Sequence, residues 1–170
     1  FRLGYRNDNR GDWIVYPYFQ EGRCVNLKYR FLQKPGEKKF FEWITGYPRP
    51  LYNIDSLNGS DTVTITEGES DLITLIQAGG QGVAIPNGAE NFAPEHWDVL
   101  SQFRRINLAL DPDPAGRRGA AKIARRLGAD RCFLVPLPER QDINDFFQQG
   151  KTLKDFERLI EQAQPMGEPT

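Results

Sequence analysis

Two segments decide the fold: Val63-Thr64-Ile65-Thr66-Glu67-Gly68-Glu69-Ser70-Asp71 and Ile106-Asn107-Leu108-Ala109-Leu110-Asp111-Pro112-Asp113-Pro114-Ala115-Gly116. Each is an apolar run that ends in a cluster of carboxylates. In an open parallel α/β sheet, ligands bind beyond the carboxyl ends of the strands. Carboxylates gathered there repel one another unless a cation holds them together. The two segments therefore predict a Mg²⁺ site for phosphate chemistry.

Strands and helices are expected to alternate between residues 62 and 135. The pattern predicts strands over 62–66, 82–86, 106–110 and 132–135, and helices over 70–78, 94–103 and 115–127. This order predicts an α/β fold with a parallel four-stranded sheet flanked by helices and right-handed crossovers. Two closing helices are expected over 144–149 and 153–162.

The first fifty residues are β-rich and basic, with strands expected over 13–19, 24–32 and 39–44. Ten Lys and Arg against five Asp and Glu give residues 1–50 a charge of +5, whereas twelve against eighteen give residues 51–170 a charge of −6. Alternation puts Lys28 and Arg30 on one face, so we expect an antiparallel sheet with one basic face. Such a face suits a polyanion, but ordinary solvated surface explains the charge equally well.

Length and composition set further limits. A chain of 170 residues suits one domain, or a small subdomain fused to a medium one. No apolar run is long enough to span a membrane, and no leader peptide is visible. Because the chain begins with Phe1, we expect it to be part of a longer protein, and a targeting segment removed with the preceding part would leave no trace. Cys24, Cys132 and His96 are too few for a four-ligand zinc site, and we expect two buried, reduced thiols.

A strand ending in Glu-Gly, followed by a strand ending in Asp-x-Asp with a glycine nearby, resembles the Toprim domain. The sequences at 67–71, 111–116 and 141–145 (Gln-Asp-Ile-Asn-Asp) are most similar to those of phage and plasmid primases and Twinkle-like primase-helicases. The resemblance is good over about residues 60 to 150 and looser upstream. It implies a small β-rich basic subdomain at 1–58, a Toprim catalytic domain at 59–150, and a C-terminal helix with a polar tail at 151–170.

The resemblance also implies an activity, the synthesis of short RNA primers on single-stranded DNA by Mg²⁺- or Mn²⁺-dependent nucleotidyl transfer. Asp111 and Asp113 would hold the ions that neutralise the triphosphate. Glu67 would complete the metal shell or take the 3′-hydroxyl proton. Asp71 and Asp142 are the further metal candidates. The residues expected to contact template or nucleotide phosphates are Lys28, Arg30 and Lys39.

Glu67, Asp111 and Asp113 also have a purely structural interpretation. Glu67 could be a helix-start acid favoured by the macrodipole, and Asp111-Pro112-Asp113-Pro114 alone is good turn chemistry. Asp142 could complete an acidic rim, whereas Asn144 could complete that rim or cap the following helix. The pairing of Glu67 with the two aspartates favours the functional interpretation.

Other functions are a Toprim nuclease of the OLD-like type, with water as the nucleophile, and a non-catalytic single-stranded DNA-binding module of a replicative helicase. The basic front sheet favours a primase over a nuclease, and the complete set of acids favours an enzyme over a binding module. A nucleotide-binding regulatory domain would need a glycine-rich phosphate motif, which the sequence lacks. The expected partners are single-stranded DNA, ribonucleoside triphosphates and a fused or separate helicase. The expected location is the cytoplasm and its nucleoid, or an organelle if a targeting segment was trimmed.

Overall fold

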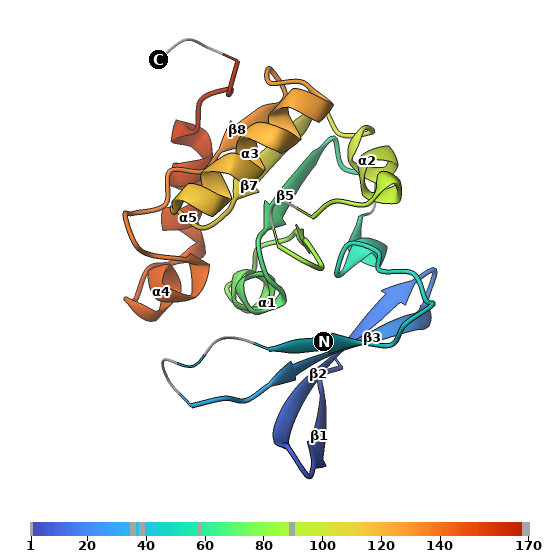
Figure 1. Ribbon diagram of the computed structural model, residues 1–170. Coiled ribbons are helices and arrows are strands. Elements are labelled where there is room, and N and C mark those ends of the chain that lie inside the picture. The colour runs from blue at the N-terminus through green and yellow to red at the C-terminus, as the bar shows by residue number, and fades with distance from the viewer. Residues whose placement is uncertain (1, 35–36, 38–39, 58, 89–90, 168–170) are drawn as a thin grey trace. The chain divides into compact units, whose positions relative to one another are not determined.

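The computed structural model describes residues 2–34, 37, 40–57, 59–88 and 91–167 (Figure 1). It divides the chain into a first unit, Phe1–Pro50, and a second unit, Leu51–Thr170. The division falls before the boundary expected at residue 58. Leu51 packs in a core of the second unit, and Tyr52 forms an antiparallel bridge with Ala84, so these residues are part of the second unit. Residues 151–167 also belong to it rather than forming a separate segment.

The first unit is an antiparallel sheet of four strands in the order β1-β2-β3-β4. The strands are β1 (Gly4–Asp8), β2 (Gly11–Gln20), β3 (Arg23–Phe31) and β4 (Phe41–Trp43). Glu21 and Gly22 both have positive φ (54° and 73°) in the two-residue turn between β2 and β3, as favoured hairpin turns require. The three expected strands are confirmed, but β1 was not predicted. Its sequence, Gly-Tyr-Arg-Asn-Asp, is polar because it forms an edge strand with largely exposed side chains.

Aromatic rings pack on both faces of this sheet. On one face, Trp13 meets Phe31 edge-on, with ring centroids 4.9 Å apart. On the other, the Tyr18 and Trp43 ring centroids are 4.8 Å apart. Both Trp13 and Tyr18 are fully buried, so neither face of the sheet is simply a charged surface.

The second unit contains the expected parallel sheet, in the order β6-β5-β7-β8. Its strands are β5 (Thr62–Thr66), β6 (Val83–Ala84), β7 (Arg105–Ala109) and β8 (Cys132–Leu134). The helices are α1 (Glu69–Gln77), α2 (Pro94–Leu100), α3 (Pro114–Leu127), α4 (Ile143–Gln148) and α5 (Leu153–Gln162), with a 3₁₀ turn at Ile54–Ser56. The fold class predicted from the sequence is therefore confirmed.

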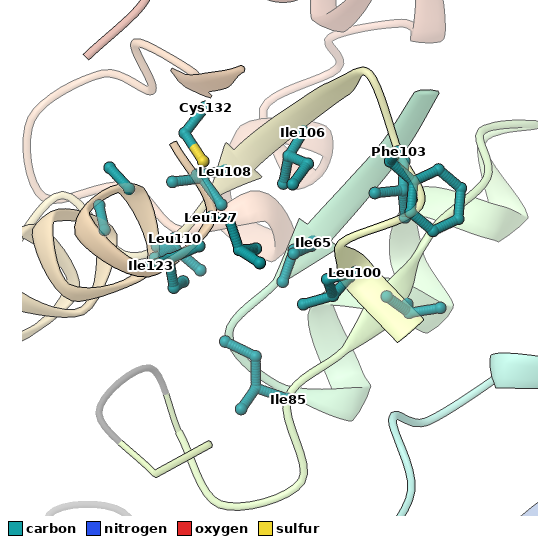
Figure 2. Close-up of a cluster of buried hydrophobic side chains, with 14 of the residues drawn as sticks. Ile65, Ile85, Leu100, Phe103, Ile106, Leu108, Leu110, Ile123, Leu127 and Cys132 are labelled. Atoms are coloured by element: carbon teal, nitrogen blue, oxygen red, sulfur yellow. The ribbon is translucent and has the colours of Figure 1, made fainter. Parts of the chain in front are cut away.

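Alternating residues of the central strands supply two cores, one on each face of the sheet. Val63, Ile65, Ile106 and Leu108 pack with residues of α3 and of the segment at Leu100–Phe103, as Figure 2 shows in part. On the opposite face, Ala109 packs with Leu75 of α1 and with residues of α4 and α5. A sheet covered on both faces leaves its strand ends as the place where polar side chains can gather.

The cysteines differ from the expectation of two buried thiols. Cys132 is buried in β8, and burial raises the pKa of its thiol to about 11. Cys24 is exposed, because it lies at the start of β3 beside the hairpin turn. Over the described residues, no helix is long and apolar enough to cross a membrane.

Candidate functional site

The two acidic segments meet at the carboxyl edge of the parallel sheet. Thr66 and Ala109 are register partners at the ends of β5 and β7, so Glu67 and Asp111 follow adjacent strands. The Glu67 Oε2 atom accepts a hydrogen bond from the Asp111 backbone N–H, with a donor–acceptor distance of 3.3 Å. The proximity of Glu67 to the Asp111 segment, expected from the sequence, is confirmed.

A second set of carboxylates lines one cavity of about 480 Å³ next to this edge. Asp111 and Asp113 approach it from the end of β7, and Asp142 approaches it from the start of α4. The cavity lining also includes Glu139, Asp145, Arg117 and Arg140. Three of the predicted acids, Asp111, Asp113 and Asp142, are thus brought together although they come from two distant segments.

Helix caps fix two of these carboxylates. Asp113 is the N-cap of α3, and its Oδ1 accepts a hydrogen bond of 2.7 Å from the Gly116 N–H. Asp142 is the N-cap of α4, and its Oδ1 accepts a hydrogen bond of 2.8 Å from the Asp145 N–H. The cap of α4 is therefore Asp142 and not Asn144, the alternative that the sequence left open. Such bonds restrict the side-chain rotamers and satisfy backbone donors at the start of each helix.

Gly116 allows α3 to begin directly against Asp111. A Cβ atom at position 116 would lie 2.1 Å from the Asp111 carbonyl oxygen and 3.0 Å from its carbonyl carbon. Both are backbone atoms, so a side chain there would push the helix away from the strand end. The glycine sets the distance between the Asp111 backbone and the helix that carries Asp113.

Asp71 lies in a buried hydrogen-bonded chain. It is 8% exposed in α1, and its Oδ1 accepts a hydrogen bond from the Asn144 amide of α4. The Asn144 Oδ1 in turn accepts a hydrogen bond from the Thr74 hydroxyl. Asp71 is not among the residues that line the cavity of Asp111, Asp113 and Asp142. Its contacts tie the segment at residues 67–71 to the segment at residues 141–145. The role of Asp71 as a metal ligand stays a prediction.

The carboxylates in the cavity fit a divalent ion whose remaining coordination positions the substrate would fill. Among the described residues, no three His, Cys, Asp or Glu side chains are grouped closely enough to hold an ion by themselves. Mg²⁺ usually takes one or two protein carboxylates and fills its remaining positions with water and substrate phosphates. Asp111 and Asp113, with Asp142 in the same cavity, supply oxygen ligands of that kind.

Two arginines in the cavity were not among the predicted site residues. Arg117 lies in the first turn of α3, and Arg140 lies in the segment that precedes α4. Arg140 has a φ of 61°, an uncommon backbone conformation for a residue other than glycine, which is often found at functional sites. Its position just before the Gln141-Asp142 pair was the available sequence signal. Together with the acids they give the cavity both signs of charge.

The predicted basic face of the first unit differs from the expectation. Lys28 is 6% exposed, and its Nζ lies 4.6 Å from the ring centroid of Phe41 and 5.5 Å from that of Trp43. This is a cation–π arrangement with β4, its neighbouring strand. Arg30 is half-buried on the same face, and Lys39 lies outside the described residues. Lys28 and Arg30 thus share one face of the sheet as expected, but the charge of Lys28 is buried there under aromatic rings.

Comparisons with known proteins show which family this chain resembles. Residues 64–147 match the family model described as Toprim-like. A gene 57 protein of Mycobacterium phage D29 is 34% identical over 127 residues, which cover 74% of this chain and 80% of that protein. The region that matches the family model includes every acid of the candidate site.

Two plant proteins are also similar. A primase homolog protein of Arabidopsis thaliana is 30% identical over 158 residues, covering 82% of this chain and 45% of that protein. A chloroplastic and mitochondrial Twinkle homolog protein of the same plant is 32% identical over 163 residues, covering 84% of this chain and 22% of that protein. The chain therefore spans less than half the length of these two relatives.

Solved structures share the fold. The primase fragment of the bacteriophage T7 primase-helicase protein has a TM-score of 0.71 at 23% identity, covering 94% of this chain and 65% of that one. A DNA primase domain from Pseudomonas aeruginosa has a TM-score of 0.72 at 22% identity, covering 96% of this chain and 57% of that one. The antiparallel unit, the parallel sheet and the acids at its carboxyl edge thus occur here on a fold shared with primase fragments, and the chain belongs to the Toprim-like family.

Proposed function

We propose that this chain is the catalytic core of a DNA primase, which makes short RNA primers on single-stranded DNA by metal-dependent nucleotidyl transfer. The observation that carries the proposal is the gathering of acids at one edge of the parallel sheet. Glu67 accepts a hydrogen bond from the Asp111 N–H, and Asp111, Asp113 and Asp142 line one cavity. The similarity to proteins named primase homolog and Twinkle homolog supports the same activity.

Asp111 and Asp113 would hold Mg²⁺ or Mn²⁺, with Asp142 as a further ligand in the same cavity and Asp71, which does not line that cavity, as another candidate. When bound, such an ion would neutralise charge on the triphosphate and polarise its phosphoryl oxygens. Arg117 and Arg140 line the same cavity, where their guanidinium groups would pair with phosphate oxygens. The cavity would therefore orient the nucleotide from two sides.

Glu67 is the candidate for the proton transfer. In the reaction, the 3′-hydroxyl oxygen of the growing primer forms a bond to the α-phosphorus, the bond from that phosphorus to pyrophosphate breaks, and the hydroxyl proton must leave. Glu67 adjoins the Asp111 backbone, so its carboxylate could accept this proton close to the acids that bind the nucleotide. Alternatively, Glu67 would complete the metal shell, and the proton would pass to water.

The proposed partners are a single-stranded DNA template, ribonucleoside triphosphates and a replicative helicase, fused or separate. One structural neighbour is part of a primase-helicase protein, which supports the last of these. Arg30 and Lys39 are proposed to contact template or nucleotide phosphates, whereas the buried Lys28 is not. We propose that the protein acts where DNA is replicated, in the cytoplasm and its nucleoid or in an organelle.

The products formed from single-stranded DNA, labelled ribonucleotides and Mg²⁺ test this proposal. Labelled oligoribonucleotides that disappear when Mg²⁺ is chelated are the expected result. Shortened DNA without new RNA would identify a nuclease instead. DNA binding with neither product would identify a non-catalytic module. Either of the last two outcomes contradicts the proposed function.

A further inference from the structure

Helix α3 carries a line of positive charge on its exposed side. Arg118, Lys122 and Arg125 follow one another at spacings of four and three residues, so they lie on one side of the helix. Arg117 and Arg126 flank them, and all five side chains are exposed. At about 1.5 Å of rise per residue, the central three span roughly 10 Å. We call these five residues the basic stripe.

The charge of the stripe is opposite in sign to the net charge of the second unit. The second unit carries twelve Lys and Arg against eighteen Asp and Glu, a charge of −6, yet five of the twelve lie on α3, whose sequence has no acid. Like charges four residues apart, such as Arg118 and Lys122, destabilise an isolated helix. Only Arg125 and Arg126, in the last turn, gain from the helix macrodipole. Helix stability alone does not favour this arrangement.

The stripe begins at the candidate site. Arg117 lines the same cavity as Asp111 and Asp113, and Asp113 is the N-cap of α3. From there the stripe runs along the outer side of α3, while Ile123 and Leu127 of the inner side pack in the core seen in Figure 2. Figure 1 shows α3 lying in front of β7 and β8, and the helix contacts β8. A polyanion that enters the cavity can therefore continue along the helix.

The residue types indicate which polyanion would bind. The exposed side of α3 presents Arg, Lys, Pro114 and Ala121 but no aromatic ring. Proteins that hold single strands usually stack the bases on aromatic side chains, whereas in a duplex the base faces are already stacked on one another and contacts that do not depend on sequence go to the phosphates and sugars. Arginine matches phosphate oxygens with two parallel hydrogen bonds. A duplex backbone fits the stripe better than a single strand does.

We propose that the basic stripe binds the phosphate backbone of the template–primer duplex as this duplex leaves the cavity. The inference rests on the proposed function, because that reaction would form an RNA/DNA duplex beside Asp111 and Asp113. It adds the part of the stripe beyond Arg117, which does not line the cavity.

The test measures binding of a short RNA/DNA hybrid and of the matching single-stranded DNA over a range of salt concentrations, without metal or nucleotide. The stripe variant is Arg118→Gln/Lys122→Gln/Arg125→Gln, which leaves Arg117 and the cavity unchanged. The matched control is Lys151→Gln/Lys154→Gln/Arg158→Gln, which removes the same charge from other exposed positions. Arg118→Lys/Arg125→Lys keeps the charge of the stripe.

The stripe variant should bind the hybrid roughly tenfold or more weakly, and its salt slope should fall by about 0.9 for each phosphate that the protein no longer neutralises. Its affinity for single-stranded DNA should change much less. The control should bind the hybrid nearly as the parent does, and the charge-keeping variant should lose much less affinity than the stripe variant, because it loses paired hydrogen bonds but no charge. Thermal unfolding of every variant reports whether α3 remains folded.

Several results would overturn the inference. Unchanged hybrid binding by a folded stripe variant would do so, as would equal reductions of affinity in the stripe variant and the control. Equal reductions for hybrid and single strand would remove the duplex assignment. Normal hybrid binding with reduced affinity for a polyglutamate peptide would identify a docking site for an acidic protein instead. If the parent makes no primers, the proposed function fails, and that outcome is measured separately from hybrid binding.

Discussion

The two units of this chain use charged side chains in different ways. In the first unit, opposite charges pair within the sheet: Arg6 and Arg10 contact Asp8 at 2.7 Å and 3.3 Å, and Arg10 also bonds Glu42. In the second unit, the carboxylates of Asp111, Asp113 and Asp142 gather on one cavity, which acids outnumber arginines in lining. The paired charges of the first unit are explained by their partners within the same sheet. Gathered carboxylates at strand ends indicate a ligand of opposite charge.

The pKa values of the first unit follow from this pairing. Desolvation acts to raise the pKa of Asp8, but hydrogen bonds from the Trp13 indole, the Arg10 backbone and the Arg10 guanidinium outweigh it and lower the pKa to about 2. The hydrogen bond from Arg10 likewise lowers the pKa of Glu42. These acids stay ionised because neighbours in the same sheet hold them, with no need for a ligand.

The largest effect is expected from Glu67→Gln, which tests whether the second unit is built for chemistry. A base or shared ligand at the strand end matters mainly in the transition state, so turnover in primer synthesis should fall by roughly 10²-fold or more. Nucleotide and DNA binding should stay within a few fold, because Asp111 and Asp113 are unchanged. Steady-state kinetics and binding titrations check this. Full primer synthesis by the variant would reduce Glu67 to a helix-start acid.

Gly116→Ala should also have a large effect, because the new Cβ would meet the Asp111 backbone at 2.1 Å. Overpacking of this kind costs about 1–3 kcal/mol of unfolding free energy, and activity should fall with it as α3 moves away from Asp111. Chemical denaturation measures the decrease in stability. Ala121→Ser, at an exposed position of the same helix, should change stability by less than about 0.5 kcal/mol. Equal stability of the Gly116 variant and the parent would refute the close approach.

A moderate effect is expected when Lys28→Gln is compared with Arg30→Gln in the first unit. Lys28 is buried over Phe41 and Trp43, so its substitution should mainly lower thermal stability. Arg30 is less buried, and its substitution should weaken single-stranded DNA binding and reduce the salt slope by about 0.7. Binding measured at several salt concentrations separates the two. If neither variant changes DNA affinity, the first unit makes no phosphate contact through these residues.

The smallest effect is expected from Asp8→Asn. Folding lowers the pKa of Asp8 from 3.8 to about 2, so its contribution to stability is complete above 3.8 and is lost as the pH falls toward 2. The variant should therefore be less stable than the parent near neutrality, and the difference should shrink as the pH falls through that window, because the variant has the weaker pH dependence of unfolding. The NMR signal of the Trp13 indole N–H, which donates to Asp8, reports the local change. An Asp130→Asn control should leave that signal unchanged.

Local patterns predicted most of the second unit. The helix at 153–162 has the bounds expected from the sequence, because apolar spacing and the Thr152–Asp155 capping box are both local. The meeting of Glu67 with Asp111 follows from the rule that parallel strand ends share an edge. The bond between Asp71 and Asn144 could not be predicted, because it depends on how α1 and α4 pack.

The first unit was less predictable for a related reason. Alternation places Lys28 and Arg30 on one face of β3, but it does not say that Phe41 and Trp43 of β4 share that face. The edge strand β1 has no apolar pattern to mark it. Where a side chain's surroundings come from a neighbouring strand, sequence spacing alone gives its face and not its burial.

Metal titration tests the central claim most directly. Heats of Mg²⁺ and Mn²⁺ binding are compared for the parent, for Asp111→Asn/Asp113→Asn, and for an Asp98→Asn/Asp130→Asn control that removes two exposed acids elsewhere. Asparagine caps a helix as well as aspartate does, so α3 should keep its N-cap. We expect binding heat in the parent and the control, none in the Asp111/Asp113 variant, and metal-free thermal stability that is level or higher in that variant. Titration heats in the Asp111/Asp113 variant equal to those of the parent would contradict the site.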